Sequence, residues 1–126
     1  LIESEWYIDG SHHRIGGPCS VRRNEKGIVT WISWYQNGKP HRVGGPASIS
    51  RDDRGRVQEF NWYQNGKLHR VDSTGKASEP ASCRYDNFGK IYVRKFYING
   101  VEDMVNPDRV HGSPSDTYHH FRTKIN

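Results

Sequence analysis

The chain has 126 residues, enough for one domain, and carries a formal net charge of +5 at pH 7 with a sequence pI near 9.4. Hydrophobic residues make up 33% of the chain and aromatic residues 12%, so burial must come from a few large side chains and a thick two-layer core is not expected. No apolar run approaches the roughly 20 residues needed to cross a bilayer, and no signal peptide is visible. We therefore expect a soluble protein that is not secreted.

One stretch is repeated along the chain. Copies begin at Trp6, Trp34 and Trp62, which are 28 residues apart, and a decayed copy begins at Phe96 after 34 residues. The first two copies read WYIDGSHHRIGGPCS and WYQNGKPHRVGGPAS, whereas the third reads WYQNGKLHRV and is then interrupted by the insertion DSTGKASE. Self-similarity at a fixed period is the signature of a repeat protein. We predict one repeat domain of four copies over residues 1–105 and a C-terminal tail over 106–126.

Two kinds of turn sequence recur in the copies. The first is an Asp-Gly or Asn-Gly pair, typical of a type I′ hairpin turn, at 9–10, 37–38, 65–66 and 99–100. The second is a D/N-x-x-G turn at 24–27, 52–55 and 86–89. The segments between the turns are rich in β-branched and aromatic residues. The pattern predicts an all-β fold, an antiparallel meander of about eight strands built from four β-hairpin repeats.

The two-residue turn sets the register of each hairpin, because partners can be counted outward from it. The count pairs Trp34 with His41 and, further from the turn, Ile32 with Val43; in the next copy it pairs Phe60 with Val71. It predicts a structural rib on one face: Trp6, His13, Trp34, His41, Trp62, His69 and Phe96, the last facing Asp103. The opposite face, which we name the Tyr/Arg face, is the candidate partner-binding surface: Tyr7, Arg14, Tyr35, Arg42, Tyr63, Arg70 and Tyr97.

The arginines of the Tyr/Arg face allow two interpretations. Arginines that repeat roughly every 10 Å beside tyrosine rings are typical of a surface that binds phosphates and stacks on bases. Alternatively, each arginine lies over a neighbouring aromatic ring as a cation–π contact, or pairs with an acidic residue of the adjacent turn. Because the positive charge is spread over every repeat and forms no dense patch, the second interpretation is favoured.

The histidines do not predict a metal site. His13, His41 and His69 are one hairpin apart, so roughly 10 Å separates their Cβ atoms, whereas zinc needs donors at about 2.0–2.3 Å. An imidazole packed against the facing tryptophan is the favoured interpretation. We expect no metal and no cofactor.

No catalytic motif is present: the chain lacks G-x-S-x-G, G-x-x-x-x-G-K-[ST], C-x-x-C and H-E-x-x-H. A Ser/His/Asp group could be assembled from His111, Ser113 and Asp116 of the tail, but polar tails contain such triplets by chance. We expect no catalytic residues and a protein that is not an enzyme. Cys19 and Cys83 occupy different columns of the repeat, which argues against a disulfide and favours a reducing compartment.

The tail breaks the repeat. Asn106-Pro107 and Ser113-Pro114 indicate turns, and the stretch SDTYHHFRTK favours an irregular segment or a short helix. Its expected role is to cover the last strand, because an open sheet edge invites unwanted pairing; a docking peptide is the alternative.

The pattern W-Y-x-N-G-K-x-H-R-x-x-G-P-A resembles the MORN repeat, especially a longer variant found in bacteriophage, giant-virus and bacterial proteins, including YwqK-type antitoxins. The resemblance covers roughly Trp6 to Val105 and is specific in the copies at 6–20 and 34–48. It implies β-hairpins stacked into an elongated sheet that acts as a non-enzymatic interaction or structural scaffold. The chain has H-R where the MORN pattern usually has H-G, so binding to a lipid surface is not expected.

The resemblance also implies a viral or phage-associated role, as a particle component or a protein docked on a host factor. The expected partner is another protein or a second copy of the chain, and the expected location is the host-cell cytoplasm or the virion. The alternative function is a basic nucleic-acid-binding module that uses the Tyr/Arg face.

Overall fold

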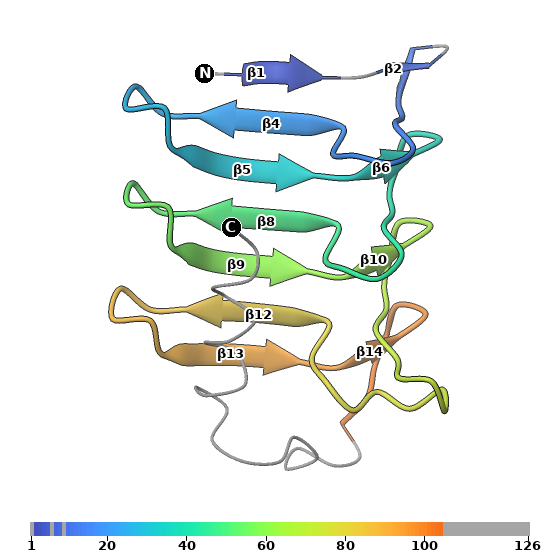
Figure 1. Cartoon of the computed structure of the whole chain (residues 1–126). Coiled ribbons are helices and arrows are strands. Elements are labelled where there is room, and N and C mark those ends of the chain that lie inside the picture. Colours follow the sequence, from blue (N-terminus) through green and yellow to red (C-terminus); the bar gives the residue numbers. More distant parts are fainter. Residues whose placement is uncertain (1, 6, 9, 105–126) are drawn as a thin grey trace.

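The computed structural model describes residues 2–5, 7–8 and 10–104, and Trp6 of the rib, Val105 and the tail over 106–126 lie outside them. As predicted, the fold is all-β and antiparallel. Its main sheet has the order β1-β4-β5-β8-β9-β12-β13, with neighbours in sequence paired along its length (Figure 1). The seven strands are β1 (Ile2–Glu5), β4 (Ser20–Arg23), β5 (Val29–Ser33), β8 (Ser48–Arg51), β9 (Val57–Asn61), β12 (Ser82–Tyr85) and β13 (Ile91–Lys95).

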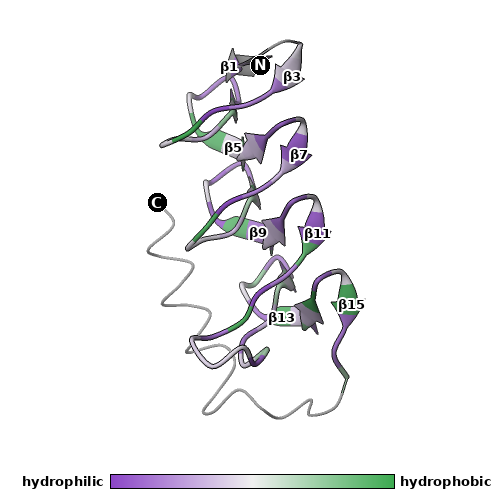
Figure 2. Ribbon diagram, turned by 90° about the vertical axis from the view of Figure 1, so that its right-hand side faces the viewer, coloured by the Kyte–Doolittle hydropathy of each residue, from purple (hydrophilic) through white to green (hydrophobic). Residues whose placement is uncertain are grey.

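Four short hairpins stand beside this sheet, one above another (Figure 2). They pair β2 (Tyr7–Ile8) with β3 (Ser11–His12), β6 (Tyr35–Gln36) with β7 (Lys39–Pro40), β10 (Tyr63–Gln64) with β11 (Lys67–Leu68), and β14 (Tyr97–Ile98) with β15 (Val101–Glu102). At the tip of the second hairpin φ is 52° at Asn37 and 75° at Gly38. Positive φ at both central residues is what a type I′ turn requires, so the predicted hairpin turn is confirmed there.

The turns at the other end of the main sheet are built around one side-chain acceptor. The carboxylate Oδ1 of Asp52 accepts hydrogen bonds from the backbone N–H groups of Arg54 and Arg56, both at 2.9 Å. Asn24 and Asp86 do the same in their turns. Asp72 forms a fourth turn of this type inside the insertion. Its D-x-x-G pattern at 72–75 carries the signal in the sequence, but this turn was not among those predicted.

Near each hairpin tip the predicted register is confirmed, but farther out it is wrong. The N–H of His41 donates to the carbonyl of Trp34 at 3.0 Å, as the count from the turn requires. The predicted partner of Ile32, Val43, is 77% exposed, and Ile32 instead pairs with Val21 on one side and Ile49 on the other.

The same correction applies to the next copy, where Phe60 pairs with Ile49 and Cys83 and not with Val71. The physical reason is that residues 42–46 leave the hairpin and cross back to the main sheet, which brings β8 alongside β5. A strand with neighbours on both sides has partners for all its backbone groups. The insertion simply lengthens the corresponding crossing segment of the third copy.

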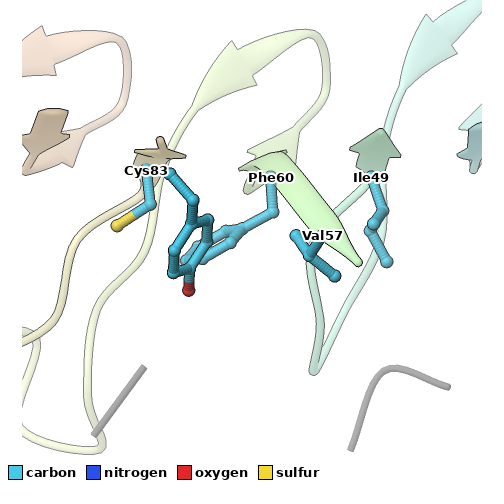
Figure 3. Packing of buried hydrophobic residues seen from close by; sticks show 5 residues of the cluster. Ile49, Val57, Phe60 and Cys83 are labelled. Carbon is cyan, nitrogen blue, oxygen red and sulfur yellow. The ribbon is translucent and has the colours of Figure 1, made fainter. Parts of the chain in front are cut away.

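The core lies on one side of the main sheet, where side chains from neighbouring strands point the same way (Figure 3). Ile49, Val57, Phe60, Cys83 and Tyr85 form this cluster, and Trp34, Trp62 and Ile91 pack against it. Phe60 and Cys83 are fully buried, and Ile49 and Val57 are 1% exposed. A few large side chains therefore supply the burial, as the composition suggested.

Candidate functional site

Hydrogen bonds join neighbouring short hairpins directly, in addition to the strand pairing of the main sheet. Between the second and third, the N–H of Arg42 donates to the carbonyl of Tyr63 at 3.2 Å and the N–H of Gly66 donates to that of Pro40 at 2.9 Å. A third bond runs from the N–H of Asn65 to Nδ1 of His41 at 3.0 Å. We name this set of three the inter-hairpin contacts.

The inter-hairpin contacts recur with nearly the same geometry along the chain. Asn37 donates to Nδ1 of His13 and Asn99 donates to Nδ1 of His69, both at 3.0 Å. An imidazole that accepts at Nδ1 is neutral and carries its proton on Nε2. The rib histidines therefore join successive hairpins, a role that was not predicted from the sequence. The signal was the constant interval of 24 residues from His13 to Asn37 and from His41 to Asn65.

Two arginines of the proposed Tyr/Arg face lie over tryptophan rings. The Cζ atom of Arg42 is 3.8 Å from the centroid of the Trp34 ring, and that of Arg70 is 4.0 Å from the centroid of Trp62. Burial lowers the pKa of Arg42. At these two positions the cation–π interpretation is correct, and each guanidinium group lies over the tryptophan ring of its own copy.

Each of the three repeated arginines also donates to the carbonyl of the following proline. The Nη1 atoms of Arg14, Arg42 and Arg70 bond to Pro18, Pro46 and Pro80 at 3.2, 3.1 and 3.1 Å. The guanidinium of Arg42 packs closely on the glycine before the proline, because a Cβ on Gly45 would lie 2.7 Å from Cζ of Arg42. In the third copy Glu79 stands there, and its carboxylate pairs with Arg70.

The tyrosines of the face remain together. The His12 ring lies between Tyr7 and Tyr35, with ring centroids 4.4 and 5.1 Å away. Tyr7 is 52% exposed, whereas Tyr35, Tyr63 and Tyr97 are half-buried. Burial raises the pKa of Tyr63, and a hydrogen bond to Glu5 raises that of Tyr7. The face is therefore a tyrosine row without the guanidinium groups of Arg42 and Arg70.

Two apolar side chains are on the surface, one of which, Val43, the register count placed on the apolar face. Ile15 and Val43 occupy the same position in the first two copies, and each is 77% exposed. They lie on the segments that cross from one hairpin to the next strand. Val71, at this position in the third copy, is half-buried.

The possible metal ligands and the two thiols were located in the described part of the chain. Its residues contain no group of three or more His, Cys, Asp and Glu side chains that could hold a metal ion. Cys19 and Cys83 are both buried and are not joined by a disulfide, and burial raises the pKa of the Cys83 thiol to about 12. Among these residues no helix is long and apolar enough to span a membrane.

Comparison with known proteins gave no match: no family model, no curated protein and no solved structure is significantly similar to the chain.

Proposed function

We propose that the chain is a MORN-like, non-enzymatic interaction scaffold, whose repeats present the same side chains at regular steps to a protein partner. The observation that carries this proposal is the equal exposure of Ile15 and Val43, 77% each, at equivalent positions of two copies. Single exposed apolar residues are ordinary on protein surfaces. Ile15 and Val43 differ from such single residues, because they repeat at roughly 10 Å, two strand spacings apart. They form the first two members of a row of exposed apolar side chains.

The inter-hairpin contacts support the same proposal, because they hold successive hairpins at a constant spacing. A partner that recognises one repeat can then contact the next without ordering it first, and this preorganisation reduces the entropic cost of binding. The resemblance to the MORN variant adds a viral or phage-associated setting, with the chain as a particle component or docked on a host protein.

The test is site-specific photo-crosslinking in the cells that make the protein, with the crosslinker at position 15, at position 43 and, as a control, at Lys26 in an exposed turn. We expect one and the same protein adduct from positions 15 and 43 and none from position 26. The purified adduct partner should bind the Ile15→Asp/Val43→Asp variant at least about tenfold more weakly. If the two positions share no adduct, the proposal is wrong. Light scattering on the purified chain shows whether the partner is a second copy.

The alternative, a nucleic-acid-binding module, relies on the arginines of the Tyr/Arg face. The guanidinium groups of Arg42 and Arg70 are already held by a tryptophan ring and a proline carbonyl, which favours the scaffold. Under the alternative, the purified chain would carry nucleic acid, visible in its 260/280 nm absorbance ratio. Replacing Arg42 and Arg70 by alanine would then flatten the salt dependence of binding by roughly one unit for each phosphate that the protein no longer neutralises.

A further inference from the structure

A small polar pocket opens near the N-terminal end of the main sheet. It measures about 200 Å³ and is lined by Glu5, His12, Ser20, Arg22, Trp31 and Tyr35, with Ser33 completing the lining. Ser20 and Arg22 alternate with Val21 along β4, so the pocket lies on the side of the sheet away from the core. It is smaller than the roughly 300–1,000 Å³ of sites for drug-sized ligands, which restricts it to a small molecule or a single unit of a larger one.

The Ser20 hydroxyl is the first sign that the pocket is a binding site. Ser20 is 4% exposed, and its Oγ has no hydrogen-bond partner among the residues that the structure describes. A buried hydroxyl without a partner is costly. The wall of the pocket therefore contains a polar atom whose hydrogen bond is unmet.

In the next repeat a larger side chain, Asn61, occupies the position equivalent to Ser33. Asn61 occupies the position of Ser33, one repeat on, in the paired row Ser20-Ser33-Ser48-Asn61-Ser82. Its Nδ2 donates to Ser48 Oγ at 3.4 Å and to Glu59 at 3.0 Å, and its Oδ1 accepts from Ser82 Oγ at 2.7 Å. In that repeat one asparagine side chain serves both flanking hydroxyls. At Ser33 the shorter side chain leaves space, and Ser20 is left without this partner.

The lining combines aromatic surface with hydrogen-bond donors and hydrogen-bond acceptors. Trp31 and Tyr35 supply ring surface, and the Glu5 carboxylate accepts from the Tyr7 hydroxyl at 3.0 Å and lies 3.5 Å from Nε2 of His12. Arg22 adds N–H donors, and the two serines add hydroxyls that both donate and accept. A ligand with many hydroxyl groups and an apolar ring face satisfies such a set. The charges of Glu5 and Arg22 offset each other, so the pocket has no net charge that would favour a phosphate or a carboxylate.

From these observations we propose that this pocket binds one neutral sugar ring, either a free monosaccharide or the terminal unit of a glycan. The sugar hydroxyls bond to Ser20, Glu5 and Arg22, and the ring packs against Trp31 or Tyr35. This site is distinct from the row begun by Ile15 and Val43, and its existence does not depend on the scaffold proposal.

The experiment is a titration of the full chain, labelled with ¹⁵N, with D-glucose, D-galactose and N-acetyl-D-glucosamine in turn. We expect at least one of them to give a saturable shift of the Trp31 indole N–H, with a dissociation constant in the millimolar range. Ser33→Asn copies the arrangement at Asn61, so this variant should keep the folded spectrum and lose the shift. Asn61→Ser, the matched control, changes the same row in the other repeat and should leave the Trp31 response intact.

Three outcomes would overturn the proposal: no sugar moves the Trp31 signal, the Ser33→Asn variant responds as the native chain does, or inorganic phosphate produces the shift and the sugars do not. A positive result with the three monosaccharides is extended with a methyl glycoside of the best one. Equal affinity for the glycoside indicates that the end of a glycan chain can supply the ligand, and loss of binding restricts the site to the free sugar.

Discussion

Nδ1 of His41 accepts a hydrogen bond from the backbone N–H of Asn65, 24 residues further along the chain, at 3.0 Å. The contact joins two hairpins that are separated in the sequence by the paired strands β8 and β9 of the main sheet. It makes the imidazole a structural acceptor, which an aromatic ring of similar size without a nitrogen could not replace.

Replacing His41 by Phe removes this acceptor and keeps a ring. Because the contact is exposed to solvent, we expect a modest loss in the free energy of unfolding, about 0.5–1.5 kcal/mol, together with faster hydrogen exchange at the Asn65 amide. Urea unfolding and amide exchange measure the two effects. Lys26→Ala, in an exposed turn away from this contact, should change neither; unchanged exchange at Asn65 in His41→Phe would contradict the assigned role of the histidine.

Gly45→Ala tests the packing of Arg42 on Trp34. The new Cβ would lie 2.7 Å from Cζ of Arg42, so the guanidinium has to shift on the ring. Because Arg70 keeps both its ring and its proline carbonyl beside Glu79, we expect a cost of about 1 kcal/mol or less. In an Arg42→Ala background the same substitution should cost much less. A double-mutant cycle by urea unfolding measures this coupling, and additive effects would rule out the proposed contact.

Phe60→Ala and Val43→Ala test the corrected register. Phe60 is fully buried in the core cluster, so its truncation should lower the free energy of unfolding by about 3–5 kcal/mol. Val43 is 77% exposed, and its truncation should change stability by no more than about 0.5 kcal/mol. Comparable losses at both positions, measured by denaturant unfolding, would restore the pairing of Ile32 with Val43.

The turn in the insertion should weaken in acid. Hydrogen bonds from the Thr74 hydroxyl and from the N–H groups of Lys76 and Thr74 lower the pKa of Asp72 from 3.8 to about 2. A carboxylate with a lowered pKa stabilises the fold above its unfolded-state value, and this stabilisation is lost as the pH falls through the folded-state value. Asp72→Asn keeps the acceptor, as Asn24 does in the first turn, but removes the titration.

Denaturation midpoints of the native chain and of Asp72→Asn, measured between pH 5 and pH 2, provide the comparison. The difference between the two proteins should be constant above about pH 4 and should change progressively as the pH approaches 2. A difference that does not depend on pH would show that the Asp72 carboxylate contributes nothing through its charge.

The Cys83 thiol should resist alkylation in the folded protein. It is fully buried, and its pKa is raised to about 12, so at pH 8 hardly any thiolate is present to react. We expect iodoacetamide to modify Cys83 only after urea is added, as read by mass spectrometry of the peptides. Rapid modification of the folded chain would contradict the burial of this side chain.

The sequence by itself determined the features that depend on neighbouring residues. Asn37-Gly38 specifies a type I′ turn through backbone conformation alone, and Asp52 specifies its turn through hydrogen bonds two and four residues away. The 28-residue period and the pairing of Trp34 with His41 follow from those turns. Local chemistry of this kind needs no knowledge of the rest of the fold.

The tertiary structure decided everything that depends on which strand lies beside which. Ile32 could continue its hairpin toward Val43 or pair with Ile49, and the second arrangement prevails because the main sheet then satisfies the backbone on both sides of β5. The crossing segment that results carries Arg42 onto Trp34 and leaves Val43 in solvent. The pocket at Ser33 likewise forms where β1, β4, β5 and the first two hairpins meet, a long-range arrangement that no count along one hairpin contains.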